Sequence, residues 1–315
     1  MKMKRSIQSI LMIAAVTMLI LTGCSTDNGD GEANGDEPSA QSGYPMTVVD
    51  SLGNEVTLEE EPQKIVSVSP TLTETIFAIG AGDKMIGRTE YCNYPEEAQE
   101  LEVIGGFADP NTELILELEP DLVFSSGPVP EESLALFKGS DIDVLVIDGK
   151  TVDEIMENIT KLGSILSVED QAAQVNEEIQ SEREEVKSKL GDVEAKRVFV
   201  DLGNFFSAGS GSYIHSIIED EIGAINVAAQ GEGEWPMMSL EQIVEADPQV
   251  YFYTPMGDEQ LEEMEGLNDT TAFVEENIVK VQMGSTENDI MTRAGARVGK
   301  TIRFFAESVY PEAFE

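Results

Sequence analysis

The chain has 315 residues, of which 61 are Asp or Glu and 19 are Lys or Arg, so its formal net charge at pH 7 is −42. A surface this acidic repels phosphate backbones, which excludes nucleic-acid binding through a basic patch. Hydrophobic residues make up 41 %, enough to build packed cores, so the charge does not indicate a wholly disordered chain. The length allows two packed domains.

Residues 1–23 are predicted to be a signal peptide. Three cations lie within residues 1–5, and a short apolar run over 10–21 follows. This order is typical of a secretory signal, and the run is too short to span a bilayer as a permanent helix. The segment Leu21-Thr22-Gly23-Cys24 resembles the lipobox of bacterial lipoproteins. We therefore expect lipidation of Cys24 and anchoring to the membrane outside the cytoplasm.

Residues 24–43 are predicted to be a disordered tether, because they are Ser, Thr, Asp, Asn, Gly, Glu and Pro with almost nothing apolar to bury. Cys92 is the only other cysteine. With Cys24 lipidated, no intrachain disulfide is available. No second apolar segment approaches transmembrane length.

The body of the chain alternates short β-branched runs with longer amphipathic stretches. This alternation predicts an α/β fold with mostly parallel central sheets. The predicted strands are Lys64–Ser69, Asp121–Ser125, Val144–Asp148, Arg197–Leu202, Gln249–Tyr253 and Ile278–Met283.

An internal repeat indicates a duplication. Residues 111–124 are matched by residues 239–252, 128 positions further along. That offset is too long for a solenoid and fits one lobe, so we predict two similar lobes, 44–167 and 192–315. Residues 168–191 between them are highly charged with one apolar stripe, which predicts a single long helix joining the lobes. We expect a ligand cleft between the lobes.

Each copy of the repeat contains a short helix, a Pro-containing turn and a strand. Asn111 and Ser239 stand where N-caps are expected. Glu113 and Glu241 then lie in first helical turns, where the helix dipole favours an anion. Cap chemistry alone would account for both carboxylates.

Aromatic residues make up only 6 % of the chain, so those in loops stand out. Tyr91, Phe107 and Trp235 all lie in segments rich in Gly, Pro or Asn. They could pack under loops or form flat apolar walls for a large planar ligand in the cleft.

His215 is the only histidine, which argues against a zinc or manganese site. Its place after a Gly-Ser loop fits a first-turn helix residue better than an axial ligand of haem iron. No Gly-x-Ser-x-Gly elbow is present, so we do not expect an enzyme, although spacing alone leaves a surface hydrolase open. We expect no catalytic residues, no metal site and no cofactor.

The order and spacing of three segments resemble the class III substrate-binding lipoproteins of ABC importers, which take up cobalamin, haem and iron–siderophore complexes. These segments are Ile65–Glu74, Tyr94–Ala98 and Pro110–Val123. The likeness runs from about Tyr44 to Phe314. It implies a monomeric extracytoplasmic receptor that delivers its cargo to a membrane permease.

Within this family, the segment Trp235–Val244 is most similar to the cobalamin-binding members. That similarity implies a corrinoid cargo held by rings and by a second loop. Ile290 and Met291 replace aromatic residues of those members, and Phe107 replaces a Trp. The implied ligand-binding residues are Tyr91, Phe107, Trp235, Asp289, Ile290, Met291, Thr292 and Arg293.

The resemblance also implies a role for the repeated carboxylates. In this family one surface Glu per lobe pairs with Arg on the two permease subunits, and Glu113 and Glu241 occupy those positions.

Two other cargoes stay open at this point. An anionic ferric siderophore would require cations in the cleft, for which Arg88, Arg293 and Arg297 are the candidates. Haem would require His215, a Tyr or a Met on its iron.

Overall fold

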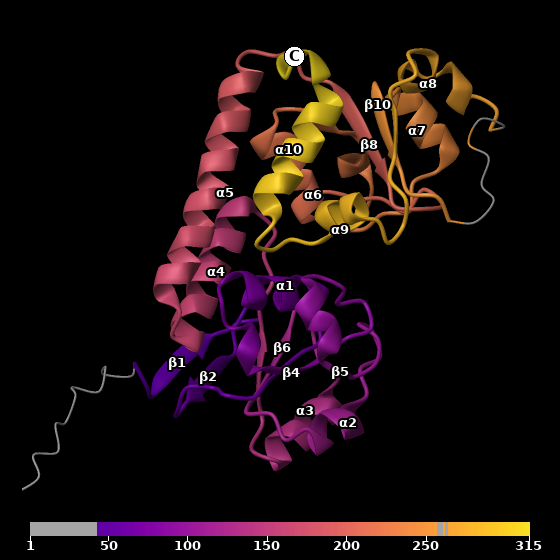
Figure 1. The fold of residues 1–315 in the computed structure, drawn as a ribbon. Helices are drawn as coiled ribbons and strands as arrows, with labels where there is room; N and C mark the ends of the chain where they lie inside the picture. Colours follow the sequence, from indigo (N-terminus) through magenta and orange to yellow (C-terminus); the bar gives the residue numbers. More distant parts are fainter. Residues whose placement is uncertain (1–42, 257–260, 262–263) are drawn as a thin grey trace, which may run out of the picture. The chain divides into compact units, whose positions relative to one another are not determined.

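Two parallel β-sheets, one in each half of the chain, confirm the predicted α/β class (Figure 1). The structure is a computed structural model that describes residues 43–256, 261 and 264–315. The predicted signal peptide, Cys24 and the tether up to residue 42 lie outside the described residues. We call the first sheet with its helices the N-terminal lobe and the second the C-terminal lobe.

The two sheets share one strand order. The first runs β5-β4-β3-β6-β7 and the second runs β9-β8-β10-β11. In the first sheet β3 lies between β4 and β6, as β8 lies between β9 and β10 in the second, and the N-terminal lobe adds β5 at one edge. The strands are β3 (Ile65–Ser67), β4 (Met85–Arg88), β5 (Glu102–Val103), β6 (Leu122–Ser125), β7 (Asp143–Val146), β8 (Arg197–Asp201), β9 (Ile225–Asn226), β10 (Val250–Tyr253) and β11 (Ile278–Lys280).

This common order is what a duplication produces. The repeated segments form helix α2 (Thr112–Glu117) before β6 and helix α7 (Leu240–Ala246) before β10. The side chains of Asn111 and Ser239 accept hydrogen bonds from the backbone N–H groups of Leu114 and Gln242, as predicted for N-caps.

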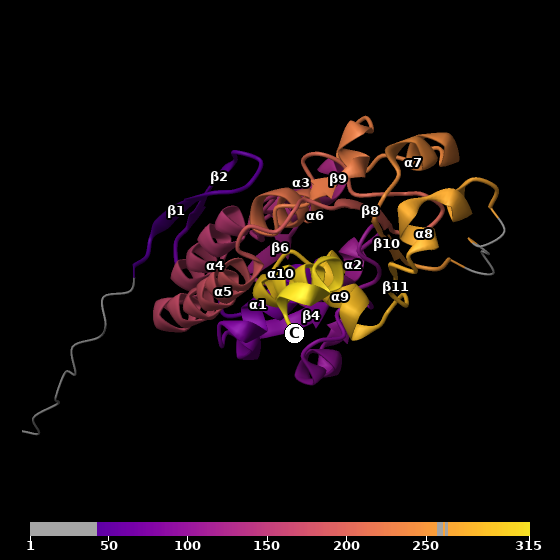
Figure 2. The same cartoon turned by 90° about the horizontal axis from the view of Figure 1, so that it is seen from above.

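The six predicted strands are present with bounds within three residues of the prediction, and three strands of the sheets were not predicted, namely the four-residue β4 and the shorter β5 and β9. β9 and β5 have two residues each, which is too little for a period to show. An antiparallel hairpin of β1 (Met46–Val49) and β2 (Glu55–Leu58) was also not predicted (Figure 2).

The long helix α5 (Glu169–Leu190) lies inside the predicted range 168–191 and connects the two lobes along the chain. It packs along α4 (Val152–Leu166) on one side and α10 (Val298–Val309) on the other (Figure 1). The left-handed backbone of Ser167, with φ 56°, reverses the chain between α4 and α5. The remaining α-helices are α1 (Pro70–Ala78), α3 (Glu131–Gly139), α6 (Tyr213–Ser216), α8 (Thr271–Val274) and α9 (Thr286–Thr292).

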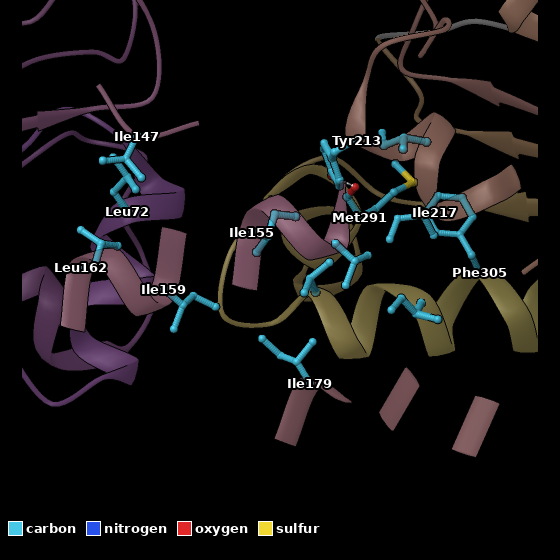
Figure 3. Close-up of a cluster of buried hydrophobic side chains, with 14 of the residues drawn as sticks. Leu72, Ile147, Ile155, Ile159, Leu162, Ile179, Tyr213, Ile217, Met291 and Phe305 are labelled. Atoms are coloured by element: carbon cyan, nitrogen blue, oxygen red, sulfur yellow. Dashed lines mark hydrogen bonds between the residues drawn. The ribbon is translucent and has the colours of Figure 1, made fainter. Parts of the chain in front are cut away.

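One hydrophobic core extends through both lobes (Figure 3). Ile155 and Ile159 of α4 belong to the same buried cluster as Ile179 of α5 and Phe305 of α10. The lobes therefore share buried apolar surface, which restricts their relative motion more than a single helical connection would.

In the part of the chain that the structure describes, no helix has both the length and the apolar character needed to cross a membrane.

Truncation of Ile179 tests the shared core. Ile179→Ala should lower the free energy of unfolding by about 2–5 kcal/mol, because it leaves a cavity between α5 and its neighbours. Urea denaturation followed by circular dichroism measures the loss. Val274→Ala, at a side chain that is 69 % exposed, is the control and should change stability by less than about 0.5 kcal/mol. Two separate unfolding transitions, one per lobe, would contradict a common core.

Candidate functional site

A cavity of about 840 Å³ lies between the lobes, within the range of small-molecule sites. Leu72, Ile155, Ile159 and Leu162 supply apolar walls, and loops from both lobes form the rim. A large ligand can therefore bury apolar surface below while polar loops contact its edge.

Three aromatic side chains line this cleft and remain partly open to solvent. Tyr91 is 57 % exposed, Phe107 is 50 % exposed and Trp235 is 39 % exposed. Rings that packed under loops would be covered. These rings instead offer apolar surface that a ligand can bury.

Backbone hydrogen bonds hold the loops of the N-terminal lobe. The Glu90 N–H donates to the Gly105 carbonyl at 3.0 Å, which joins the loop of Tyr91 to the loop of Phe107. The Cys92 N–H donates to the Thr89 carbonyl at 3.1 Å, and the Cys92 side chain is buried beneath the turn.

The loop of Trp235 is pressed against a neighbouring segment of the C-terminal lobe. The Gly209 N–H donates to the Glu234 carbonyl at 2.8 Å. A Cβ at Gly209 would lie 2.6 Å from the Gly233 carbonyl oxygen, so only glycine allows this approach. The ring of Phe206 stacks behind Trp235, with centroids 6.2 Å apart and planes at 24°.

A buried carboxylate of α1 connects the two lobes. Glu74 is 4 % exposed and forms ion pairs with two residues of the C-terminal lobe, Arg293 and Arg297. The Arg297 Nε lies 2.7 Å from Glu74 Oε2, and its Nη2 lies 2.8 Å from Oε1. Arg297 also lies over the ring of Tyr94, 4.4 Å from its centroid.

The terminal nitrogens of Arg293 are engaged by the protein itself. Nη1 donates to Glu74 and to Asn93 Oδ1 at 2.8 Å, while Nη2 donates to the Tyr91 carbonyl at 3.1 Å and lies 2.7 Å from Asp289 Oδ1. Asn93 in turn donates to Asp289 Oδ2 at 2.9 Å. Arg293 therefore positions the loop of Tyr91.

The lobes approach each other closely beside this cluster. The Ala296 N–H donates to Thr75 Oγ1 at 3.2 Å. A Cβ at Gly295 would lie 2.7 Å from the same oxygen, so a larger residue would push the lobes apart.

Lys150 forms a second bridge at the rim of the cleft. Its Nζ lies 2.8 Å from Asp148 and 2.7 Å from Glu234 of the C-terminal lobe. Partial burial opposes its charge, but the hydrogen bonds that its ammonium group donates to the two carboxylates outweigh that cost and raise the pKa of Lys150. The cation stays protonated and connects the N-terminal lobe to the loop of Trp235.

The predicted second loop is only partly in the cleft. Asp289, Thr292 and Arg293 line it. Met291 does not, because its side chain is fully buried in the core and its carbonyl accepts a hydrogen bond from Tyr213 (Figure 3). Ile290 is likewise absent from the lining, and its carbonyl accepts from Thr301 Oγ1. Both lie on α9, whose inner face packs on the core.

Two further candidate residues also lie elsewhere. Arg88 is buried outside the cleft lining and donates to the carbonyls of Thr89 and Gln99. His215 lies in the first turn of α6, with its backbone N–H on the Ser212 cap. Its ring Nδ1 lies 3.3 Å from Asn226 Nδ2, and it does not line the cleft.

Glu74, Lys150 and Phe206 were not identified as functional from the sequence. Of the three, Glu74 could have been noticed in the sequence, since it is the only charged residue in the mostly apolar stretch Leu72–Ile79. The partners of Lys150 and Phe206 are distant in sequence, so no local pattern revealed them. Among the described residues, no group of three or more His, Cys, Asp or Glu could hold a metal ion.

Comparison with known proteins assigns the chain to a family. Residues 65–282 match the family model described as periplasmic binding protein. The chain belongs to this family.

Individual relatives agree with that membership. The chain is 28 % identical, over the full length of both proteins, to the uncharacterized ABC transporter substrate-binding lipoprotein YvrC of Bacillus subtilis (strain 168). It is 30 % identical to a vitamin B12-binding protein of Yersinia pestis (strain Pestoides F), over 60 % of this chain and 68 % of the relative.

A solved structure shares the fold. The haem-binding protein RhuT of Roseiflexus sp. RS-1 superimposes with a TM-score of 0.67 at 24 % identity, covering 80 % of this chain and 99 % of that one. The family match and these relatives make the chain a substrate-binding protein of an ABC importer.

Neutralising Glu74 tests the ionic connection between the lobes. Glu74→Gln should lower the free energy of unfolding by about 3–5 kcal/mol, because it leaves the largely buried guanidinium group of Arg297 without a counter-charge and Arg293 with Asp289 alone. Chemical denaturation measures the loss. Glu312→Gln, which removes the exposed partner of Lys196, is the matched control and should cost no more than about 1 kcal/mol. Equal effects of the two variants would contradict a special role for Glu74.

Proposed function

We propose that this protein is a membrane-anchored receptor that binds a corrinoid in the interlobe cleft and delivers it to an ABC permease. The observation that supports this most directly is the set of three partly exposed rings, Tyr91, Phe107 and Trp235, which line one cavity from loops of both lobes. Flat apolar walls of this kind suit a large planar ring system.

The remaining ligand contacts follow from the cleft lining. The Thr292 hydroxyl can meet amide groups at the edge of a corrin ring, whereas the two oxygens of Asp289 are already held by Arg293 and Asn93. Arg293 contributes mainly by fixing Asp289 and the Tyr91 loop, since its Nη hydrogens are already accepted by protein oxygens. Similarity to a vitamin B12-binding protein supports the same choice of cargo.

A ferric siderophore or haem receives less support. Arg293 and Arg297 are paired with carboxylates, and Arg88 lies outside the cleft lining, so none is free for an anionic catecholate. His215 does not line the cleft, so the iron of a bound haem would need a lining Tyr or Met, of which Tyr91 and Met283 are exposed. The ring neighbours of His215 are Asn226 and Glu219, so its contacts do not support a hydrolase either.

We propose that Glu113 and Glu241 dock the receptor on its permease. Both side chains are exposed in first turns of equivalent short helices, one per lobe. Two equivalent carboxylates suit two equivalent cations on a dimeric permease, because charge-assisted pairs set orientation and encounter rate. Lipidation of Cys24 would hold the receptor near that permease.

Binding can be read from the single tryptophan of the chain. Cyanocobalamin added at micromolar concentration should quench Trp235 fluorescence in a saturable manner, since the ring lines the cleft. Phe107→Ala should weaken binding about tenfold through lost stacking area. Leu136→Ala, at an exposed apolar side chain outside the lining, is the control. Absence of quenching would remove the corrinoid proposal.

Docking can be separated from cargo binding. The double variant Glu113→Lys, Glu241→Lys should abolish cargo uptake into cells or permease vesicles, with ligand affinity in solution unchanged. The matched control is Glu55→Lys, Glu275→Lys, which reverses one exposed carboxylate per lobe away from these helices. If the Glu113→Lys, Glu241→Lys variant still takes up cargo, these two carboxylates do not dock the receptor and only stabilise the N-termini of their helices.

A further inference from the structure

Among the side chains that line the cleft, carboxylates outnumber cations. Two cations, Lys150 and Arg293, line it together with a larger set of carboxylates. These carboxylates are Glu90, Asp148, Glu234 and Asp289. The wall that meets the cargo is therefore acidic.

Both cations are already neutralised by the protein. Lys150 lies between Asp148 and Glu234, at 2.8 and 2.7 Å. Arg293 is held by Asp289 and by the buried Glu74, which also binds Arg297. An anionic group on a cargo could pair with either cation only by displacing a carboxylate that bridges or braces the lobes.

Glu90 is different, because none of the described cations lies within ion-pair distance of it. It is exposed, lines the cleft and directly precedes Tyr91. Glu234 precedes Trp235 in the same way, so a carboxylate stands next to two of the three open rings. Aromatic faces attract cations, and apolar walls concentrate the field of the carboxylates between them.

We infer that the cleft selects its cargo by charge, preferring a metal chelate with net positive charge over a neutral one and rejecting anionic chelates. This inference rests on the proposed function, because it names the charge class of the cargo that the same cleft binds. The three rings select the cargo by its size and planarity. Glu90 and the other unbalanced carboxylates of the cleft select it by its net charge.

A pair of corrinoids of nearly equal shape tests this. Aquocobalamin at slightly acidic pH keeps its cobalt-bound water and a positive charge, while cyanocobalamin is neutral. Isothermal titration at low salt should show about two- to fivefold tighter binding of aquocobalamin. The difference should shrink at high salt, where exposed charges are screened.

Variants assign the effect to the cleft. Glu90→Gln should reduce the preference for aquocobalamin with little change for cyanocobalamin, and Glu90→Lys should reverse it. Glu117→Gln removes an exposed carboxylate outside the cleft and should leave the preference intact. If Glu117→Gln had the same effect as Glu90→Gln, the net charge of the whole protein would be responsible and the inference would be overturned.

Two iron chelates distinguish this inference from the proposed function. Equal, salt-independent binding of both corrinoids would overturn the charge selection and leave the corrinoid receptor standing. Binding of a cationic ferric trihydroxamate with no corrinoid binding would overturn the corrinoid and support the charge selection. Binding of an anionic ferric tricatecholate alone would overturn both.

Discussion

Glu74 and its two arginine partners are the constraint on which the rest of the site depends. The carboxylate belongs to α1 of the N-terminal lobe, and both guanidinium groups come from the C-terminal lobe. A buried charge is costly unless it is paired, so the lobes must keep the arrangement that pairs all three groups. The same arginines brace Tyr91, Asn93 and Tyr94, so this cluster sets one wall of the cleft.

The shared core reinforces this constraint. Because α4 and α10 each pack along α5 and their apolar faces join in one cluster, a wide opening of the lobes would expose buried surface. Small changes in angle remain compatible with this packing, and the Lys150 bridge, which is more exposed than the Glu74 cluster, is the contact that such changes would break first.

The cleft combines two kinds of recognition that depend on different parts of the structure. The rings stand on loops fixed by backbone hydrogen bonds, and they offer area to any flat cargo. The carboxylates around them discriminate by charge. Because Lys150 and Arg293 are used to hold the lobes together, the same ion pairs that connect the lobes also leave the cleft acidic.

The sequence by itself determined the fold class, the duplication, the capped helices that present Glu113 and Glu241, and the long helix near Glu169–Leu190. These depend on local periodicity, on cap residues and on a repeat, all of which are visible along the chain. It also identified Tyr91, Phe107 and Trp235 as rings that line the cleft, because aromatic residues are scarce in this chain and these three lie in loops. Only the tertiary structure decided that Met291 is a core residue, that Arg293 is a brace, and that Glu74 and Lys150 bridge the lobes. Those roles depend on partners at least 78 residues away, which no local pattern encodes.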